Sequence, residues 1–266
     1  MGSVDIFPDG PEPPDFEGRV ALVTGAGAGI GAATAQLLAA RGARVAVNYR
    51  QDADRAQEVV DLIRKRGGDA VAIRADVTDP DQVDDLVTAT GSELGAVDVL
   101  VLNAAGLGAH DARVALATEL TWDDLERVVT RQLKALFLTT RAVLPAMIAR
   151  REGAVVAVGA ALARRPAPGF LPLAVAKAGV QAAVRTLALE AGPHGVRVNA
   201  VEPNLILTEL ADLIPQEQRR AVAARAAVRR NGTPRDVAET IAFLASPRSS
   251  YLTGACVLAD GGTTFA

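Results

Sequence analysis

Short apolar runs rich in valine and alanine recur along most of the chain, and longer stretches of helical pattern separate them. Seven of these runs have the length and composition of β-strands, namely residues 19–24, 44–49, 70–74, 97–102, 153–159, 196–201 and 255–260. Continuous apolar strands with helical returns are typical of a parallel sheet that is covered on both faces and binds ligands at the carboxyl ends of its strands. The pattern predicts an α/β fold with a doubly wound parallel sheet of about seven strands in a single domain.

The first 17 residues do not share this pattern. They contain four prolines and five acidic residues and show little apolar periodicity. Such a segment buries too little apolar surface to offset the entropy lost on ordering. We expect residues 1–17 to form a flexible N-terminal tail and residues 18–266 to form the folded domain.

The length and composition fit a globular domain that acts on small molecules. Of the 266 residues, 50% are hydrophobic and the net charge is −3, so the chain can bury a sizeable core. Lysine supplies only three of the 28 cationic residues, and 3% of the residues are aromatic, which gives no basic, stacking surface for nucleic acid. We expect a small-molecule substrate and no nucleic-acid partner.

The sequence shows no targeting signal and no metal-binding pattern. It has no membrane-length apolar run, and its start lacks the basic region and apolar stretch of a secretory signal. Cys256 is the single cysteine, and His110 and His194 are the only histidines, so we expect no internal disulfide and no metal. These features predict a soluble, cytoplasmic protein without a membrane partner.

A glycine-rich turn follows the first predicted strand. The segment "TGAGAGIG", residues 24–31, has glycines at Gly25, Gly29 and Gly31 and leads into a helical pattern. Glycine allows the tight turn and the close approach of the backbone to a pyrophosphate, which the helix N-terminus then holds. The alternative is a tight strand-to-helix connection without a ligand. The position of the motif favours dinucleotide binding.

The second predicted strand ends in Asn48, Tyr49 and Arg50, without the Asp or Glu that binds a ribose 2′-hydroxyl. An arginine at this point pairs well with a 2′-phosphate. A solvated arginine at a strand end is the alternative. The sequence therefore favours NADP(H) over NAD as the cofactor.

With these motifs the sequence resembles the short-chain dehydrogenase/reductase family, above all its ketoacyl-reductase-like members. The resemblance runs from about Gly18 to Gly262 and includes "ADV" (75–77), "LNAAG" (102–106), "RVNAVEPN" (197–204) and "TGACVLADGG" (253–262). It implies a Rossmann-type sheet with the strand order 3-2-1-4-5-6-7. It also implies that the cofactor is bound by Gly25, Gly29, Ile30, Gly31, Asn48, Tyr49, Arg50, Asp76, Val77, Asn103, Ala104, Ala105, Gly106, Lys177, Ile206 and Thr208.

In this family an Asn, a Ser, a Tyr and a Lys carry the chemistry, because hydride addition to a carbonyl builds an alkoxide that needs hydrogen bonds and a proton. By the resemblance, Lys177 matches the lysine. Leu173 stands at the tyrosine position, Ala160 at the serine position and Gln132 at the asparagine position. Three of the four catalytic positions are changed.

A shifted alignment does not restore the missing hydroxyl groups. The chain has only two tyrosines, Tyr49 and Tyr251, and no serine between residues 93 and 245. The proton donor has therefore been replaced or lost.

Few residues could take over the donation of a proton. His110 follows the fourth predicted strand on a loop that borders the site in this family, although a lone loop histidine is more often a solvated surface residue. Glu202 ends the sixth predicted strand, where burial could make it a general acid or where it could simply hydrogen-bond backbone. The candidate catalytic residues are Lys177, Gln132, His110 and Glu202.

Three functions stay open at this point. The first is an NADP(H)-dependent oxidoreductase of biosynthetic type that acts on a carbonyl or hydroxyl group with a replaced proton donor, such as His110, Glu202 or a relayed water. The second is a non-redox cyclase or isomerase that uses the same pocket. The third is a catalytically silent subunit, with a vestigial cofactor site, that pairs with an active relative. Family members commonly form dimers or tetramers, so we expect a homo-oligomer or a hetero-oligomer with an active relative.

Overall fold

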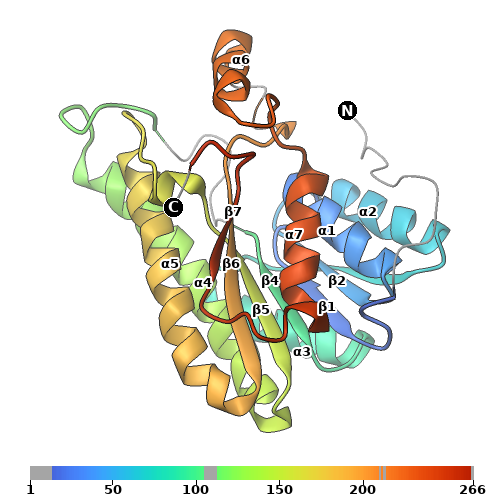
Figure 1. The fold of residues 1–266 in the computed structure, drawn as a ribbon. Coiled ribbons are helices and arrows are strands. Elements are labelled where there is room, and N and C mark those ends of the chain that lie inside the picture. Colours follow the sequence, from blue (N-terminus) through green and yellow to red (C-terminus); the bar gives the residue numbers. More distant parts are fainter. Residues whose placement is uncertain (1–13, 105–112, 210, 212–213, 265–266) are drawn as a thin grey trace.

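One seven-stranded sheet forms the centre of the computed structural model, which describes residues 14–104, 113–209, 211 and 214–264 (Figure 1). The strand order is β3-β2-β1-β4-β5-β6-β7, and all paired neighbours run parallel. The strands are β1 (Val20–Val23), β2 (Arg44–Tyr49), β3 (Asp69–Arg74), β4 (Val99–Leu102), β5 (Gly153–Val158), β6 (Val196–Pro203) and β7 (Cys256–Ala259). The predicted doubly wound parallel sheet and its strand order are confirmed.

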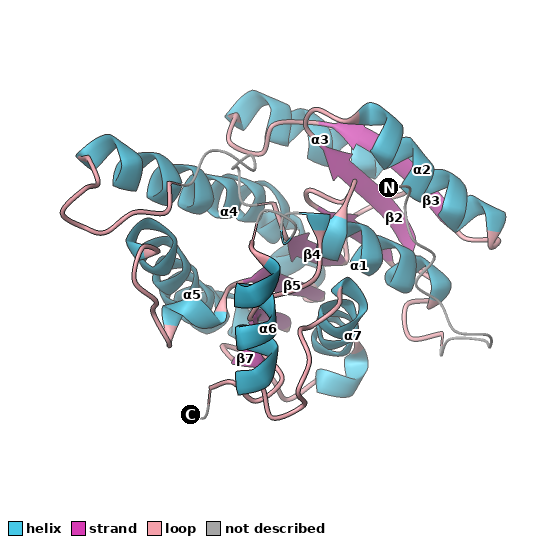
Figure 2. Cartoon of the chain, turned by 90° about the horizontal axis from the view of Figure 1, so that it is seen from above, coloured by secondary structure: helices cyan, strands magenta, loops and turns pink. Residues whose placement is uncertain are grey.

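Helices cover both faces of the sheet and return the chain between its strands. They are α1 (Gly29–Ala40), α2 (Ala53–Lys65), α3 (Pro80–Glu93), α4 (Trp122–Arg150), α5 (Leu171–Ala191), α6 (Gln216–Arg225) and α7 (Pro234–Ala245), with short 3-10 turns η1 (Ala161–Ala163), η2 (Gly192–His194) and η4 (Pro247–Ser249). Figure 2 shows α4 and α5 on one side of the sheet and α1 and α7 on the other.

Alternate residues of a strand face different cores. In β1, Ala21 and Val23 pack with α1, α2 and α7, whereas Val20 and Leu22 pack with α3, α4 and α5. All four side chains are at most 1% exposed, and full burial of a side chain such as Leu22 stabilises the fold by about 1.5–3 kcal/mol. The continuous apolar runs in the sequence reflect this burial on both faces.

Polar residues fix the start of four helices. The side chains of Asp52, Asp79, Thr121 and Thr233 accept hydrogen bonds from backbone N–H groups in the first turns of α2, α3, α4 and α7. At α4 and α7 an aspartate three residues further on bonds back to the threonine and completes a capping box. These helix starts are therefore satisfied by the chain itself.

The packed part of the chain begins before the expected boundary at Gly18. Phe16 is 1% exposed, belongs to the core on the α1 side, and donates its backbone N–H to the carbonyl of Arg41 at 2.9 Å. Asp15 pairs with Arg248. Phe16 stands among acidic and proline residues in the sequence, which is why composition alone did not indicate that it packs against the core. Residues 1–13 lie outside the described residues.

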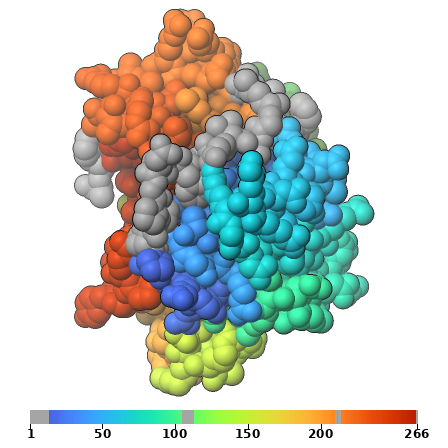
Figure 3. All heavy atoms as spheres, turned by 90° about the vertical axis from the view of Figure 1, so that its right-hand side faces the viewer, coloured from blue at the N-terminus to red at the C-terminus, as the bar shows by residue number. Residues whose placement is uncertain are grey.

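Helix α6 stands beyond the carboxyl end of β6 and projects from the rest of the molecule (Figure 1; Figure 3). None of its residues is buried. It therefore adds little to the core and lies at the end of the sheet where ligands are expected.

Two further features of the described residues concern membrane spans and metal-binding clusters. No helix in them is long and apolar enough to cross a membrane. In the same part of the chain, no three or more His, Cys, Asp or Glu side chains gather where they could hold a metal ion.

Candidate active site

The glycine-rich turn between β1 and α1 has no room for side chains. Gly25 and Gly29 have φ values of +62° and +55°, in the left-handed region that favours glycine. A Cβ on Gly31 would lie 2.3 Å from the carbonyl oxygen of Gly25 and 2.6 Å from Nδ2 of Asn103. Asn103 donates from that amide to the carbonyls of Thr24 and Gly25, at 3.0 Å each. The turn is held tightly between β1 and the end of β4.

Thr24 joins the same two strands through its hydroxyl. Its Oγ1 donates to the carbonyl of Val101 at 3.2 Å and accepts from the backbone N–H groups of Asn103 and Ala104 at 3.0 Å. Thr24 is 2% exposed. This buried hydroxyl fixes the segment after β4 that the resemblance assigns to cofactor binding.

The start of α1 differs from the four capped helices. Ala28 gives no side-chain capping bond, and the first turn, which includes Ile30, has no acidic residue. Its backbone N–H groups and the positive end of the helix dipole therefore face the turn without a side-chain anion. Thr208 lies against this turn, with its Cγ2 3.2 Å from the Cβ position of Gly29. The arrangement fits a pyrophosphate.

Asn48 supports the turn from β2. Its Oδ1 accepts the N–H of Gly25 at 3.2 Å, and its Nδ2 donates to the carbonyls of Ile73 and Ala75 at 3.3 and 3.1 Å. The side chain is buried, and Tyr49 is half-buried against the α1-side core. Asn48 therefore supports the glycine-rich turn from β2, and Tyr49 packs beside it against the core.

An open pocket of about 490 Å³ lies at the carboxyl ends of β2 and β3. Three arginines, Arg50, Arg74 and Arg131, line it together with Asp76. Asp76 lies 3.7 Å from the guanidinium of Arg50 and 3.9 Å from that of Arg131. Burial by itself raises the pKa of Asp76, but hydrogen bonds from Thr78 and the two arginines outweigh it, so the pKa is lowered. Three guanidinium groups and one carboxylate thus line the pocket.

Lys177 is the buried cation of the site. Its Nζ donates to the carbonyl oxygen of Val158, at the end of β5, at 2.8 Å. The residue is 8% exposed, and burial lowers the pKa of its ammonium from 10.5 to about 8. On α5 it lies one turn after Leu173 and one turn before Gln181, so these three side chains share one face of the helix.

The two positions that the resemblance assigns to the family's tyrosine and serine are apolar and partly exposed. Leu173 and Ala160 are both half-buried. Gln132 is 4% exposed, and its Oε1 has no hydrogen-bond partner within the described residues. It lines a narrow gap with Thr24, Ala104 and Val158 among others. The site therefore offers an amide oxygen and an ammonium, but no hydroxyl at position 173 or 160.

Glu202 is fully buried and engaged through both oxygens. Arg164 donates from Nε to Oε2 at 2.7 Å, and Gln181 donates from Nε2 to Oε1 at 2.5 Å. Arg164 also donates to the carbonyl of Cys256 at 2.7 Å. The carboxylate and Arg164 therefore connect the η1 segment, α5 and β7. The partners of Glu202 are side chains, whereas one of the two sequence-based alternatives was hydrogen bonding to the backbone.

The remaining candidates divide into two groups. Ile206 and Val77 are 8% and 5% exposed, and Ile206 forms an isolated bridge to Gly232. Ala105, Gly106 and His110 lie outside the described residues. Their assigned roles stay predictions.

Several residues that line or support the site belong to no motif in the sequence that identifies them. Thr24 is part of the quoted turn, but its hydroxyl carries no motif signal. Arg131 directly precedes Gln132, which is the signal that could have found it. Arg74 and Arg164 are visible only once the strands are placed next to each other.

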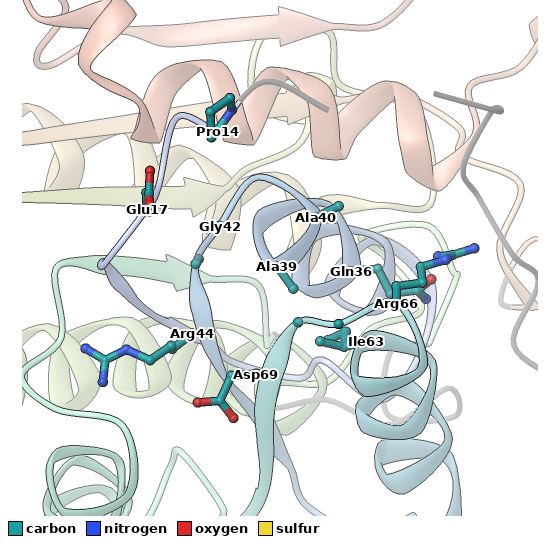
Figure 4. Close-up of a pocket in the computed structure, with 13 residues that line it drawn as sticks. Pro14, Glu17, Gln36, Ala39, Ala40, Gly42, Arg44, Ile63, Arg66 and Asp69 are labelled. Carbon is teal, nitrogen blue, oxygen red and sulfur yellow. The ribbon is translucent and has the colours of Figure 1, made fainter. Parts of the chain in front are cut away.

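A second pocket, of about 480 Å³, lies at the opposite edge, near the amino ends of β2 and β3 (Figure 4). Gln36, Arg44 and Arg66 are among the residues that line it, and Oε1 of Gln36 has no hydrogen-bond partner in the part of the chain that the structure describes. Because this pocket lies at the other end of the strands, it is separate from the site described above.

Comparison with known proteins agrees with this geometry. A protein-family model described as Enoyl-(Acyl carrier protein) reductase matches residues 25–264. The 3-oxoacyl-[acyl-carrier-protein] reductase FabG of Staphylococcus aureus is 36% identical over 244 residues, which cover 92% of this chain and 97% of that protein. The 3-oxoacyl-[acyl-carrier-protein] reductase of a Synechocystis strain is 38% identical over 245 residues, 92% of this chain and 96% of its own.

A solved structure of 7α-hydroxysteroid dehydrogenase, complexed with NADH and 7-oxo glycochenodeoxycholic acid, is also similar. It has a TM-score of 0.86 and 32% sequence identity, and the match covers 93% of this chain and 94% of that one. The sheet order and the glycine-rich turn define a Rossmann-type α/β fold. The chain belongs to the short-chain dehydrogenase/reductase family of oxidoreductases.

Proposed function

We propose that this chain is an NADP(H)-dependent oxidoreductase of biosynthetic type that interconverts a carbonyl and a hydroxyl group on a small molecule. The observation that carries the proposal is the closely packed glycine-rich turn beside the uncapped start of α1, at the carboxyl ends of β1, β2 and β4. When bound, the nicotinamide supplies or accepts the hydride.

The relatives support a carbonyl or hydroxyl substrate. Two are named reductases of 3-oxoacyl groups on acyl carrier protein, and the structural neighbour was solved with NADH and an oxo-steroid. A 3-oxoacyl thioester is therefore the first substrate to test. We further propose that the protein acts in the cytoplasm.

The arginine-lined pocket supports the choice of NADP(H). Arg50 is flanked by Arg74 and Arg131, while Asp76 offsets one of the three charges. A 2′-phosphate is a strong acceptor for guanidinium groups. A ribose 2′-hydroxyl carries no charge with which these guanidinium groups could pair.

Fluorescence titration with NADPH and NADH tests the proposal. We expect saturable binding that is roughly tenfold or more tighter for NADPH, because the phosphate pairs with arginine. Arg50→Gln should weaken NADPH binding and leave NADH binding nearly unchanged. The matched control is Lys65→Gln, which removes an exposed cation at the far end of α2. No saturation at millimolar cofactor would refute the proposal.

A specific observation favours a second candidate, the catalytically silent subunit. Leu173 and Ala160 replace both hydroxyl groups, while apolar residues such as Phe137 and Leu189 stay exposed on α4 and α5. Such a chain would bind an active relative and support its fold. Co-expression with an active family member followed by native mass spectrometry tests this: a mixed oligomer supports the candidate, and separate homo-oligomers contradict it.

A further inference from the structure

The substrate side of this site lacks a hydroxyl proton donor, and the inference below rests on the oxidoreductase function proposed above. Reduction of a carbonyl leaves a negative oxygen that must receive a proton. The side chains of Leu173 and Ala160 cannot supply one. Among the described residues of the site, the polar side chains to consider are Gln132, Lys177 and Glu202.

Two of these three are poorly suited to donate. An amide such as Gln132 has no acidic proton to give. Glu202 is fully buried, and both of its oxygens accept hydrogen bonds, one from Arg164 at 2.7 Å and one from Gln181 at 2.5 Å. We therefore treat Glu202 as a positioning residue for the η1 segment.

Lys177 has the geometry of a donor. Its Nζ uses one N–H on the carbonyl of Val158, and an ammonium has three. Leu173 precedes it by one helical turn on the same face of α5. Leu173, which the resemblance places at the family's tyrosine position, and Ala160 are both partly exposed to solvent.

The described groups around Lys177 are mostly uncharged. Val158 of β5 accepts its hydrogen bond, Leu173 and Gln181 lie one turn away on α5, and Gln132 of α4 lines a gap with Val158. The carboxylate of Glu202 on β6 is already paired with Arg164. Burial is thus the cause that destabilises the protonated form of Lys177.

We propose that the Lys177 ammonium donates the proton to the substrate oxygen through one water molecule beside Leu173. In this step the carbonyl carbon gains a hydride from the reduced nicotinamide, and the π electron pair of the C=O bond moves to the oxygen. The oxygen takes a proton from the water, and the water takes one from the ammonium. Lys177 is left as a neutral amine, which solvent reprotonates after the product leaves.

The shifted acidity of Lys177 supports this role. A pKa of about 8 populates both the ammonium and the amine close to neutral pH, as a general acid requires. An exposed lysine would stay protonated in this range.

Lysine NMR tests the inference without turnover. The chain has only three lysines, Lys65, Lys134 and Lys177, so labelling the lysine Cε with ¹³C gives three signals. Lys65 and Lys134 are exposed, and Lys65→Arg and Lys134→Arg assign their signals. We expect one signal to titrate near pH 8 and to shift when NADPH binds. A Lys177 signal that titrates with the two exposed lysines would overturn the inference.

Kinetics of two variants test the same step. Lys177→Arg keeps a cation with several N–H donors but cannot release a proton. At saturating NADPH we expect it to reduce the substrate at least about 100-fold more slowly than the unaltered protein. For the unaltered protein, kcat should fall above about pH 8 as Lys177 loses its proton. In Leu173→Tyr the pH at which kcat falls should change, because the phenol then donates the proton.

The outcomes separate the inference from the proposed function. If Lys177→Arg binds NADPH, keeps the kcat of the unaltered protein and shows the same fall of kcat above about pH 8, the role of Lys177 is refuted. Loss of activity in His110→Ala would then indicate that the histidine donates the proton. A chain that binds no NADPH would refute the proposed function instead. If Lys177→Arg does not fold, the NMR titration of the unaltered protein still decides.

Discussion

A buried ammonium such as Lys177 opposes folding even while it serves the site. Its pKa falls from 10.5 to about 8 in the folded chain, so the folded state disfavours the protonated form. Below pH 8, Lys177 is protonated in both the folded and the unfolded protein, and its burial lowers the free energy of unfolding by the full amount of about 3 kcal/mol. Between pH 8 and 10.5 the folded state loses its proton first, and stability rises with pH.

The rise of the unfolding free energy with pH can be measured by comparison with Lys177→Met, which keeps a long side chain without a charge. Relative to the variant, the unaltered protein should gain about 2 kcal/mol in unfolding free energy between pH 7 and pH 9.5. Urea unfolding at the two pH values gives the difference. A difference that does not change with pH would show that Lys177 titrates like an exposed lysine.

The missing hydroxyl groups make a second prediction at the residue scale. Leu173→Tyr combined with Ala160→Ser should raise carbonyl reduction by about 100-fold or more, because a positioned acid and an oxyanion donor are both restored. The control is Leu173→Phe with Ala160→Ser, which adds the ring without the phenol oxygen. Steady-state rates with NADPH and a 3-oxoacyl thioester check it. Equal rates in both double variants would mean that the pocket has also changed shape.

At the scale of elements, the apolar runs predicted the strands because the sheet buries both of its faces. β6 continues to Pro203, two residues past the predicted end at 201, since it pairs with β7 to that point. The charge pair between Arg164 and Glu202 could not be predicted, because the two residues are 38 positions apart and carry no motif. Packing, and not local pattern, brings them together.

The glycine-rich turn offers a sharp test at this scale. A methyl group on Gly31 would overlap the Gly25 carbonyl at 2.3 Å, so Gly31→Ala should lower the unfolding free energy by about 1–3 kcal/mol and weaken NADPH binding. Gly91→Ala in α3 meets nothing within 4 Å and should stabilise the protein by about 0.5–1 kcal/mol. Thermal unfolding of both variants checks the pair. Similar effects at both positions would contradict the account of the turn.

At the scale of the whole molecule, α4 and α5 present apolar residues to solvent. Phe137, Val175 and Leu189 are 60%, 42% and 79% exposed in the single chain. Exposed apolar groups on neighbouring helices are typical of a protein interface. The family resemblance implies an oligomer, but the sequence does not distinguish a second copy from a relative.

We therefore expect the isolated chain to form an oligomer through α4 and α5. Phe137→Arg should shift it toward the monomer, whereas Glu58→Arg on exposed α2 should not. Light scattering after size-exclusion chromatography measures the mass. A monomeric unaltered protein, or an oligomer unaffected by Phe137→Arg, would contradict this interface.

The central claim is that a chain without the family's phenol still transfers hydride. The most direct measurement incubates the purified protein with NADPH that carries deuterium on C4 of the nicotinamide and with a 3-oxoacyl thioester, and then weighs the hydroxyacyl product. The account predicts a product one mass unit heavier, formed by the unaltered protein and strongly reduced in Lys177→Arg. An unlabelled substrate recovered unchanged, from protein that binds NADPH, would contradict it.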